Sequence, residues 1–136
     1  MDSFFQWDPA KYALDVPKMD NGHKGLIASM NKLHHLREAG AGGPDLQREL
    51  EHLLQLTVRH FAEEEAFMAS IGFPGLPNHK RIHEDLLQKA RLHKERFEAS
   101  GKLTDEFFNF LRLWLKAHIC GIDVKYAAHA REHPVA

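Results

Sequence analysis

Seven side chains of types that ligate metal ions occur in four separated stretches of this chain. They are five histidines and two carboxylates: His23; His60 and Glu64; His79 and His83; His118 and Asp123. Imidazole together with carboxylate suits iron, manganese or zinc. Because a single zinc ion usually takes four ligands, seven ligands that meet at one point favour a centre of two metal ions.

Two of these stretches carry their pair at the same helical spacing. His60 and Glu64 are four residues apart, and so are His79 and His83. Residues four apart on an α-helix lie on one face. On its own, a His-x3-Glu pair is more often a pair on a helix surface, so the metal prediction depends on all four stretches meeting in one fold.

His118 and Asp123 are five residues apart and match a helix less well. At about 100° per residue they diverge by roughly 140°, so we do not expect them to share a face. We expect them instead to flank one inward direction, along which Leu115 and Tyr126 point.

The elements that must position these residues are helices. Apolar residues at helical spacing predict four of them, at about residues 18–39, 45–70, 77–99 and 103–130. Glycine and proline separate each helix from the next, except before the last, where Ser100-Gly101 does so. Four helices with short connections favour an all-α fold, an up-down-up-down antiparallel four-helix bundle.

An arm is expected to precede the first helix. Residues 1–17 contain two prolines and are expected to be extended, with four aromatic side chains as anchors: Phe4, Phe5, Trp7 and Tyr12. The length of 136 residues fits a single domain over 1–136.

The connectivity of such a bundle would gather the seven side chains. The histidine of the first helix and the pair of the third lie near the starts of their helices, and the pairs of the second and fourth lie near the ends. In an antiparallel bundle the starts of odd helices lie beside the ends of even ones. All seven side chains therefore fall at one end of the bundle.

The number of ligands also predicts how many coordination positions of such a centre would be occupied. We assume that two six-coordinate ions share both carboxylates and one solvent-derived oxygen. An ion with three histidines then has six ligands, and an ion with two has five. One position stays open, which suits a single small ligand such as O2.

Composition excludes several other classes of function. With 18 basic and 19 acidic residues, the chain has no excess of positive charge for nucleic acid or an anionic membrane. No stretch approaches about 20 consecutive apolar residues, and no signal peptide is visible, so no membrane insertion is expected. A single cysteine, Cys120, allows no internal disulfide and favours a cytoplasmic location.

The sequence does not indicate the oligomeric state.

Several residues near the candidate ligands have simpler explanations. Cys120 is expected to be a small packing residue. Glu63 and Glu65, on either side of Glu64, are expected to form a solvated acidic face. His34 and His93 are expected to be satisfied core or surface histidines rather than ligands of a second metal site.

Four motifs in order resemble a known family. They are Met19-Asp20-Asn21-Gly22-His23-Lys24 followed by Leu26, His60-Phe61-Ala62-Glu63-Glu64, His79-Lys80-Arg81-Ile82-His83, and Trp114-Leu115-Lys116-Ala117-His118-Ile119 with Asp123 and Tyr126. The arm with Trp7-Asp8 fits as well. With these motifs the chain resembles the bacterial hemerythrins, oxygen-binding non-haem di-iron proteins, from about residue 5 to 130. Asn21-Gly22 departs from the pattern, since the family more often has polar, helix-favouring residues there.

The resemblance implies a role for each candidate. One iron would be held by His79, His83 and His118, and the other by His23 and His60. Glu64 and Asp123 would bridge them, together with an oxo or hydroxo oxygen. O2 would bind at the iron of His23 and His60, with NO and azide-like small anions as further candidate ligands. The walls of the O2 pocket would be Leu115, Trp114, Ile119 and Phe61.

The function expected from this resemblance is reversible O2 binding, as a carrier, store or sensor rather than an enzyme. One alternative is a di-iron oxidase or peroxidase. Enzymes of that kind usually have carboxylate-rich sites with Glu-x-x-His pairs, whereas this site is rich in histidine. A second alternative is an O2-sensing or redox-sensing module of a signalling protein.

Overall fold

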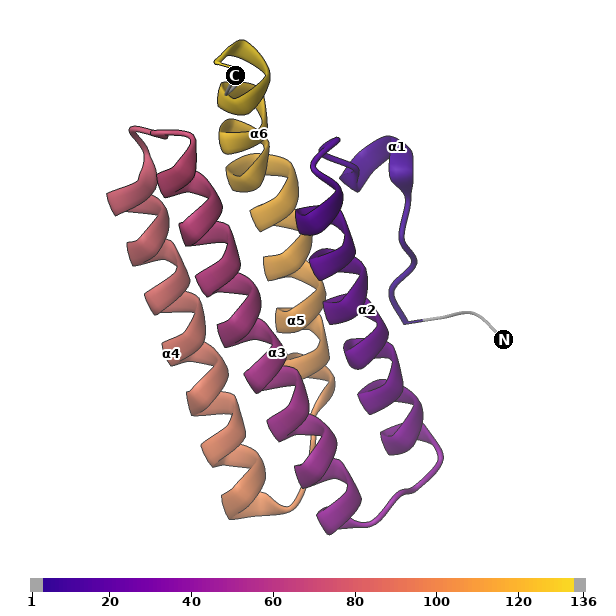
Figure 1. Cartoon of the computed structure of the whole chain (residues 1–136). Helices are drawn as coiled ribbons and strands as arrows, with labels where there is room; N and C mark the ends of the chain where they lie inside the picture. The colour runs from indigo at the N-terminus through magenta and orange to yellow at the C-terminus, as the bar shows by residue number, and fades with distance from the viewer. Residues whose placement is uncertain (1–3, 134–136) are drawn as a thin grey trace.

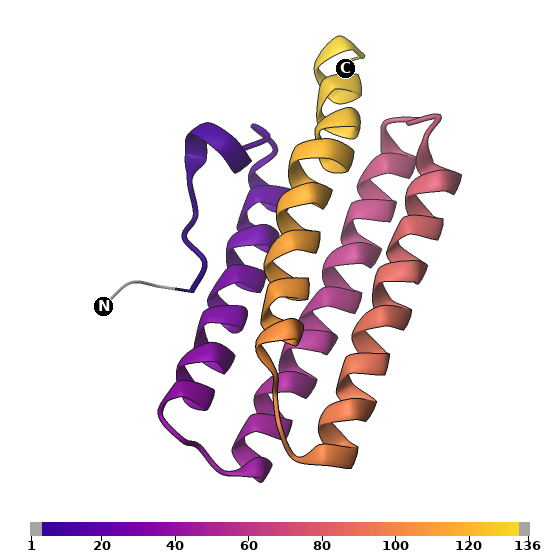
Figure 2. The same ribbon diagram turned by 180° about the vertical axis from the view of Figure 1, so that it is seen from behind.

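The computed structural model describes residues 4–133, which form an all-α antiparallel four-helix bundle, as predicted. Its helices are α1 (Pro9–Tyr12), α2 (Pro17–Glu38), α3 (Gly43–Ser70), α4 (Leu76–Ser100), α5 (Asp105–Ala117) and α6 (Val124–Glu132), with a π-helical segment, η1 (His118–Asp123), between the last two. Figures 1 and 2 show α2, α3, α4 and a last rod side by side, each running opposite to the one before it. The last rod is α5, η1 and α6 in succession.

Proline and glycine mark the ends of the long helices. Pro17, Pro44 and Pro77 stand in the first turns of α2, α3 and α4, where the missing N–H would have no helical partner and the fixed φ already suits a helix. Gly101 ends α4 in the left-handed region, at φ 73°, which a residue with a side chain rarely adopts. These three helices agree with the predicted ranges to within two residues at each end.

The prediction of a single continuous α-helix over 103–130 is wrong. The helix begins at Asp105, and the hydroxyl oxygen of Thr104 accepts a hydrogen bond from the N–H of Phe107 at 3.2 Å. The α-helix then gives way to η1 over His118–Asp123 before it resumes. A π-helical turn holds more residues than an α-helical one and often occurs at functional sites.

The N-terminal arm is not extended throughout, because Pro9–Tyr12 form the short helix α1, which Asp8 caps by accepting from the N–H of Ala10 at 3.0 Å. The arm does use its aromatic residues as anchors, since Phe5 and Tyr12 are buried. Lys11 in α1 also reaches the last rod, where its carbonyl oxygen lies 3.7 Å from Sγ of Cys120. Cys120 is exposed, so its predicted role as a packing residue is wrong.

Away from the histidines, the bundle interior is apolar. Its fully or nearly fully buried side chains include Leu33, Leu50, Leu53, Phe107, Phe108 and Leu111. Each such side chain contributes about 1.5–3 kcal/mol to folding, so this half of the bundle can hold the helices in place for the polar half. No helix among residues 4–133 is both long enough and apolar enough to cross a bilayer.

One side chain of α2 fastens the arm. The amide oxygen of Asn31 accepts from the N–H of Phe5, and its amide nitrogen donates to the carbonyl of Phe5, both at 2.8 Å. Asn31→Ala removes both bonds, at a cost of about 1 kcal/mol for each. We expect faster hydrogen exchange of the arm amides, measured by mass spectrometry, than in Asn109→Ala, which changes an exposed residue of α5. Equal exchange in the two variants would mean that Asn31 does not fasten the arm.

Candidate metal centre

All seven predicted ligand residues meet at one end of the bundle. His23 lies near the start of α2, His60 and Glu64 toward the end of α3, and the remaining four near the start of α4 and in η1. None of the seven is more than 4% exposed. The antiparallel order of the helices therefore brings together, in the interior, residues that are up to one hundred positions apart in the sequence.

The π-helical turn changes the expected relation of His118 and Asp123. Their predicted divergence of roughly 140° assumed about 100° per residue, and it is wrong here. In a π-helix hydrogen bonds join residues five apart, so residues at that spacing stack along one face. Nε2 of His118 lies 3.0 Å from Oδ1 of Asp123. The extra residue in the turn brings both side chains to the same interior point.

Three imidazoles form one half of the site. Nε2 of His118 lies 3.3 Å from Nε2 of His79 and 3.2 Å from Nε2 of His83. Two nitrogens bound to one metal ion at about 2.1 Å each, at a right angle, are roughly 3 Å apart. Oε1 of Glu64 joins this group at 3.0 Å from Nε2 of His83. The spacing fits four ligand atoms around one ion.

Two imidazoles form the other half, and the carboxylates face both halves. Oε2 of Glu64 lies 3.3 Å from Nε2 of His23 and 3.3 Å from Nε2 of His60. The two oxygens of Asp123 also face different groups: Oδ2 lies 2.9 Å from Nε2 of His23, and Oδ1 lies 3.0 Å from Nε2 of His118. Each carboxylate therefore presents one oxygen to each group of imidazoles, which is the arrangement of a bridging ligand.

The donor atoms fit metal ions better than they fit one another. Two sets have all their ligand atoms within 4.8 Å of one another, namely Glu64 with His79, His83 and His118, and Glu64 with His23 and His60. Nε2 of His23, Nε2 of His60, Oε1 of Glu64 and both oxygens of Asp123 are buried without a hydrogen bond of good geometry. Buried polar atoms are costly when they have no partner. A metal ion in each half would supply the missing partner.

The electrostatics of the site also favour a cation. Burial lowers the pKa of His23, but the carboxylates of Asp123 and Glu64 outweigh burial and raise this pKa to about 9. The same balance raises the pKa of His118 to about 9. Burial by itself would raise the pKa of Glu64 and Asp123, yet the surrounding imidazoles hold both below their usual values. The carboxylates are thus ionised and attract positive charge into the interior.

Tyr126 fixes one of these carboxylates. Its hydroxyl donates to Oε2 of Glu64 at 2.9 Å, and the ring is fully buried. Burial raises the pKa of Tyr126, and the charges of Glu64 and Asp123 raise it further. The phenol therefore stays protonated and remains a donor, which holds Glu64 in one orientation between the two groups of imidazoles.

A carboxylate outside the predicted set contacts one of the histidines. Oε2 of Glu65 lies 2.9 Å from Nδ1 of His83, so the prediction that Glu65 belongs to a solvated face is wrong. A metal-binding histidine commonly gives its second ring N–H to a carboxylate, which fixes the ring orientation. Glu63 fits the earlier interpretation better, since it pairs with Arg59 one turn away at 3.3 Å. The two glutamates differ because Glu65 faces His83 of α4, whereas Glu63 pairs with a residue of its own helix.

Apolar side chains close the site on the side of the last rod. Phe61 stacks on the ring of His83, with centroids 3.8 Å apart, and Trp114 lies edge-on to Phe61 at 5.7 Å. Leu115 and Ile119 are completely buried. The predicted pocket residues thus lie on α3, α5 and η1 next to the candidate ligands, and their role as an O2 pocket stays a prediction.

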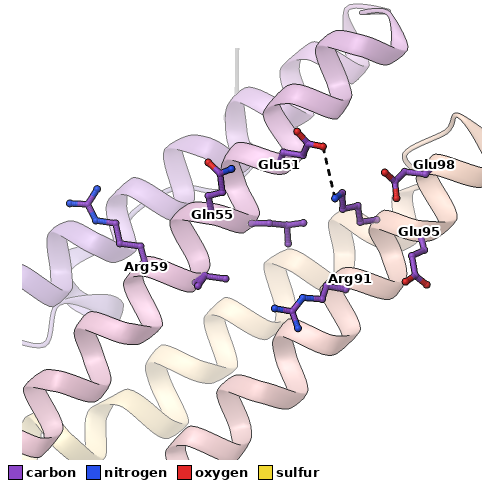
Figure 3. Close-up of a pocket in the computed structure, with 9 residues that line it drawn as sticks. Glu51, Gln55, Arg59, Arg91, Glu95 and Glu98 are labelled. Atoms are coloured by element: carbon purple, nitrogen blue, oxygen red, sulfur yellow. Dashed lines mark ion pairs between the residues drawn. The ribbon is translucent and has the colours of Figure 1, made fainter.

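Other polar features lie away from this centre. His34 stacks on Phe4 with centroids 4.6 Å apart, and His93 packs against Phe110 at 4.8 Å; neither belongs to the ligand sets described above. A surface groove of about 630 Å³ runs between α3 and α4 and is lined by none of the seven residues (Figure 3). Its charged rim is partly paired, with Lys94 and Glu51 3.9 Å apart. We interpret the groove as a solvated surface.

Known proteins resemble this chain in fold and in sequence. The family model described as the hemerythrin HHE cation binding domain matches residues 14–130. The chain is 31% identical over 130 residues to a bacteriohemerythrin of Stenotrophomonas maltophilia (strain R551-3), covering 93% of this chain and 80% of that protein. It is 33% identical over 122 residues to a myohemerythrin of Riftia pachyptila, covering 90% of each. A crystal structure of wild-type hemerythrin matches with a TM-score of 0.81 at 28% identity, over 91% of this chain and 95% of that one.

The contact between Glu65 and His83 gives a prediction with a matched control. Glu65→Gln removes the charged acceptor that orients His83, so metal affinity should fall about 10–100-fold. Glu63→Gln loses only the surface pair with Arg59 and should leave affinity unchanged. A competition titration against a chelator measures both variants. Equal affinities would show that Glu65 does not support the metal site.

Proposed function

The chain belongs to the hemerythrin family, and we propose that it binds O2 reversibly at a buried non-haem centre of two iron ions. The observation that carries this proposal is that the two oxygens of each carboxylate face different groups of imidazoles. Glu64 and Asp123 each direct one oxygen toward a group of three imidazoles and the other toward a group of two. Two groups of donors that share both carboxylates suit two neighbouring ions.

The ligands divide between the two ions in a definite way. His79, His83 and His118 would hold one iron, His23 and His60 would hold the other, and both carboxylates would bridge. When bound, the two iron ions would supply the electrons that O2 takes up on binding. With a shared solvent-derived oxygen, the ion held by three imidazoles would have six ligands. The ion held by His23 and His60 would have five and would keep one position for a small ligand.

The protein around the centre would keep O2 binding reversible. Glu64 is held by the hydroxyl of Tyr126 at 2.9 Å and His83 by Glu65 at 2.9 Å, so these two ligands keep their orientation when O2 binds and leaves. Leu115 and Ile119 are completely buried beside them. Apolar side chains at that position would exclude water and protons from the bound ligand. A site closed in this way would also admit other small ligands, such as NO or azide.

The ligand types favour binding over oxidation chemistry. The centre contains two carboxylates among seven candidate ligands, whereas bundle enzymes of the di-iron class are rich in carboxylates and use Glu-x-x-His pairs. Fewer carboxylates stabilise high-valent iron less. We therefore propose a cytoplasmic O2 carrier or store. Steady turnover with a reductant would instead indicate an oxidase or peroxidase, and a site that responds to O2 inside a longer signalling protein would indicate a sensor.

One experiment tests the proposed function directly. The purified protein is loaded with ferrous iron without air, its visible spectrum is recorded, O2 is admitted, and O2 is then removed. We expect a visible band that appears with O2 and disappears without it over repeated cycles, and two irons per chain by elemental analysis. A protein that takes up one metal ion per chain, or a band that never reverses, would contradict the proposal.

Leu115 provides a further prediction, with Leu111 as its control one turn earlier in α5. Both side chains are buried, with exposures of 0% and 3%, so either change to alanine should cost about 2–5 kcal/mol of stability. Only Leu115→Ala should open the site to water and protons and speed the decay of the oxygenated protein. Decay rates and melting temperatures separate the two effects. If both variants decay at the same rate, Leu115 has no role beyond packing.

A further inference from the structure

The ring of His60 lies against a glycine of the neighbouring helix. Gly22 is in the second turn of α2, directly before His23. A Cβ atom built on Gly22 would stand 2.6 Å from Cε1 of His60 and nearer still to Nδ1. Real Cβ atoms essentially never approach other atoms so closely. The imidazole therefore occupies space that any residue other than glycine would fill.

His60 differs in this respect from His83. Nδ1 of His83 has Glu65 as a partner at 2.9 Å, which fixes the ring by a hydrogen bond. Nδ1 of His60 is buried and has no hydrogen-bond partner among residues 4–133. Metal-binding histidines are usually oriented through that second nitrogen. The ring of His60 instead packs where a Cβ atom of Gly22 would stand.

A second glycine on the same helix provides the comparison. Gly25 is one turn after Gly22, and a Cβ atom there would have no neighbour within 4 Å. Glycine is unfavourable inside a helix wherever alanine would fit. At Gly25 no steric reason for glycine is visible, whereas at Gly22 the ring of His60 supplies one. The two positions thus separate the effect of helix propensity from the effect of contact with the ring.

There is also room for the ring to move. A surface pocket of about 190 Å³ is lined by His60 and by seven other residues, among them Gly22, Gly25 and Leu56. A ring displaced from Gly22 could turn into this space without unfolding the bundle. Its Nε2 would then leave the position 3.3 Å from Oε2 of Glu64. Such a displacement would remove one ligand from the group of two imidazoles and none from the group of three.

We propose that Gly22 is a positioning residue for His60, and that its missing side chain sets the imidazole in place for the metal ion of the two-histidine half. This inference rests on the proposed di-iron function and assigns a cause to one of its ligand positions. It also explains why Asn21-Gly22 stands before the first histidine. The glycine weakens the helix locally and lets α2 approach α3 closely enough for the ring to lie between them.

The test compares Gly22→Ala with Gly25→Ala in the full chain. Each protein is loaded with ferrous iron without air, freed of excess metal and analysed for iron per chain, and the melting temperature of each metal-free protein is recorded. We expect Gly25→Ala to keep the full iron content. Gly22→Ala should lose half of it while its metal-free form melts no earlier than wild type, because alanine favours the helix.

A second readout does not depend on iron. In the metal-free proteins, NMR should show the ring resonances of His60 shifted in Gly22→Ala, with those of His79 unchanged, and no shift of either in Gly25→Ala. Full iron content together with unshifted His60 resonances in Gly22→Ala would overturn the inference. So would loss of all the iron with early melting, which indicates a general structural role. A wild-type protein that takes up no iron would defeat the proposed function instead, and the NMR comparison would still decide the role of Gly22.

Discussion

Two carboxylates with no exposed surface, Glu64 and Asp123, are the constraint on which the rest of this structure depends. Taking an ionised carboxylate out of water costs several kcal/mol even after the protein relaxes around it. The cost can be offset only by positive charge and hydrogen-bond donors close to the oxygens. The bundle surrounds these oxygens with five imidazoles and the hydroxyl of Tyr126. Two metal ions held between them would complete the compensation, so that the same groups which make the interior costly also make it a metal site.

The irregular turn in the last rod follows from this concentration of charge. One end of the bundle holds the polar cluster, while the other is filled by apolar side chains such as Leu50 and Phe108. The last rod cannot satisfy both demands as a regular α-helix, because His118 and Asp123 would then point apart. Its π-helical turn over His118–Asp123 resolves the conflict. Irregular backbone thus occurs where the ligands require it, and regular helix occurs where packing alone decides.

The sequence predicts the parts of this structure that repeat or that follow from chain order. Apolar periodicity and the positions of proline and glycine predicted α2, α3 and α4, and antiparallel order predicted that the ligand residues meet at one end. The π-helical turn was missed because no local pattern distinguishes it from α-helix; it depends on where the neighbouring helices place the other ligands. The contact of Glu65 with His83 was missed because it depends on the rotation of α4 about its axis. Gly22 was visible only as an unusual residue before His23 until the position of His60 gave it a reason.

The central claim is that one buried cluster holds two iron ions in unequal surroundings, with three imidazoles at one and two at the other. Mössbauer spectroscopy of the oxygenated protein, loaded with isotopically enriched iron, tests this claim most directly. Two components of equal area are expected, because each chain would hold one ion of each kind and only the ion held by two histidines would have an open position for O2. A single iron component, or two components of clearly unequal area in fully loaded protein, would contradict it.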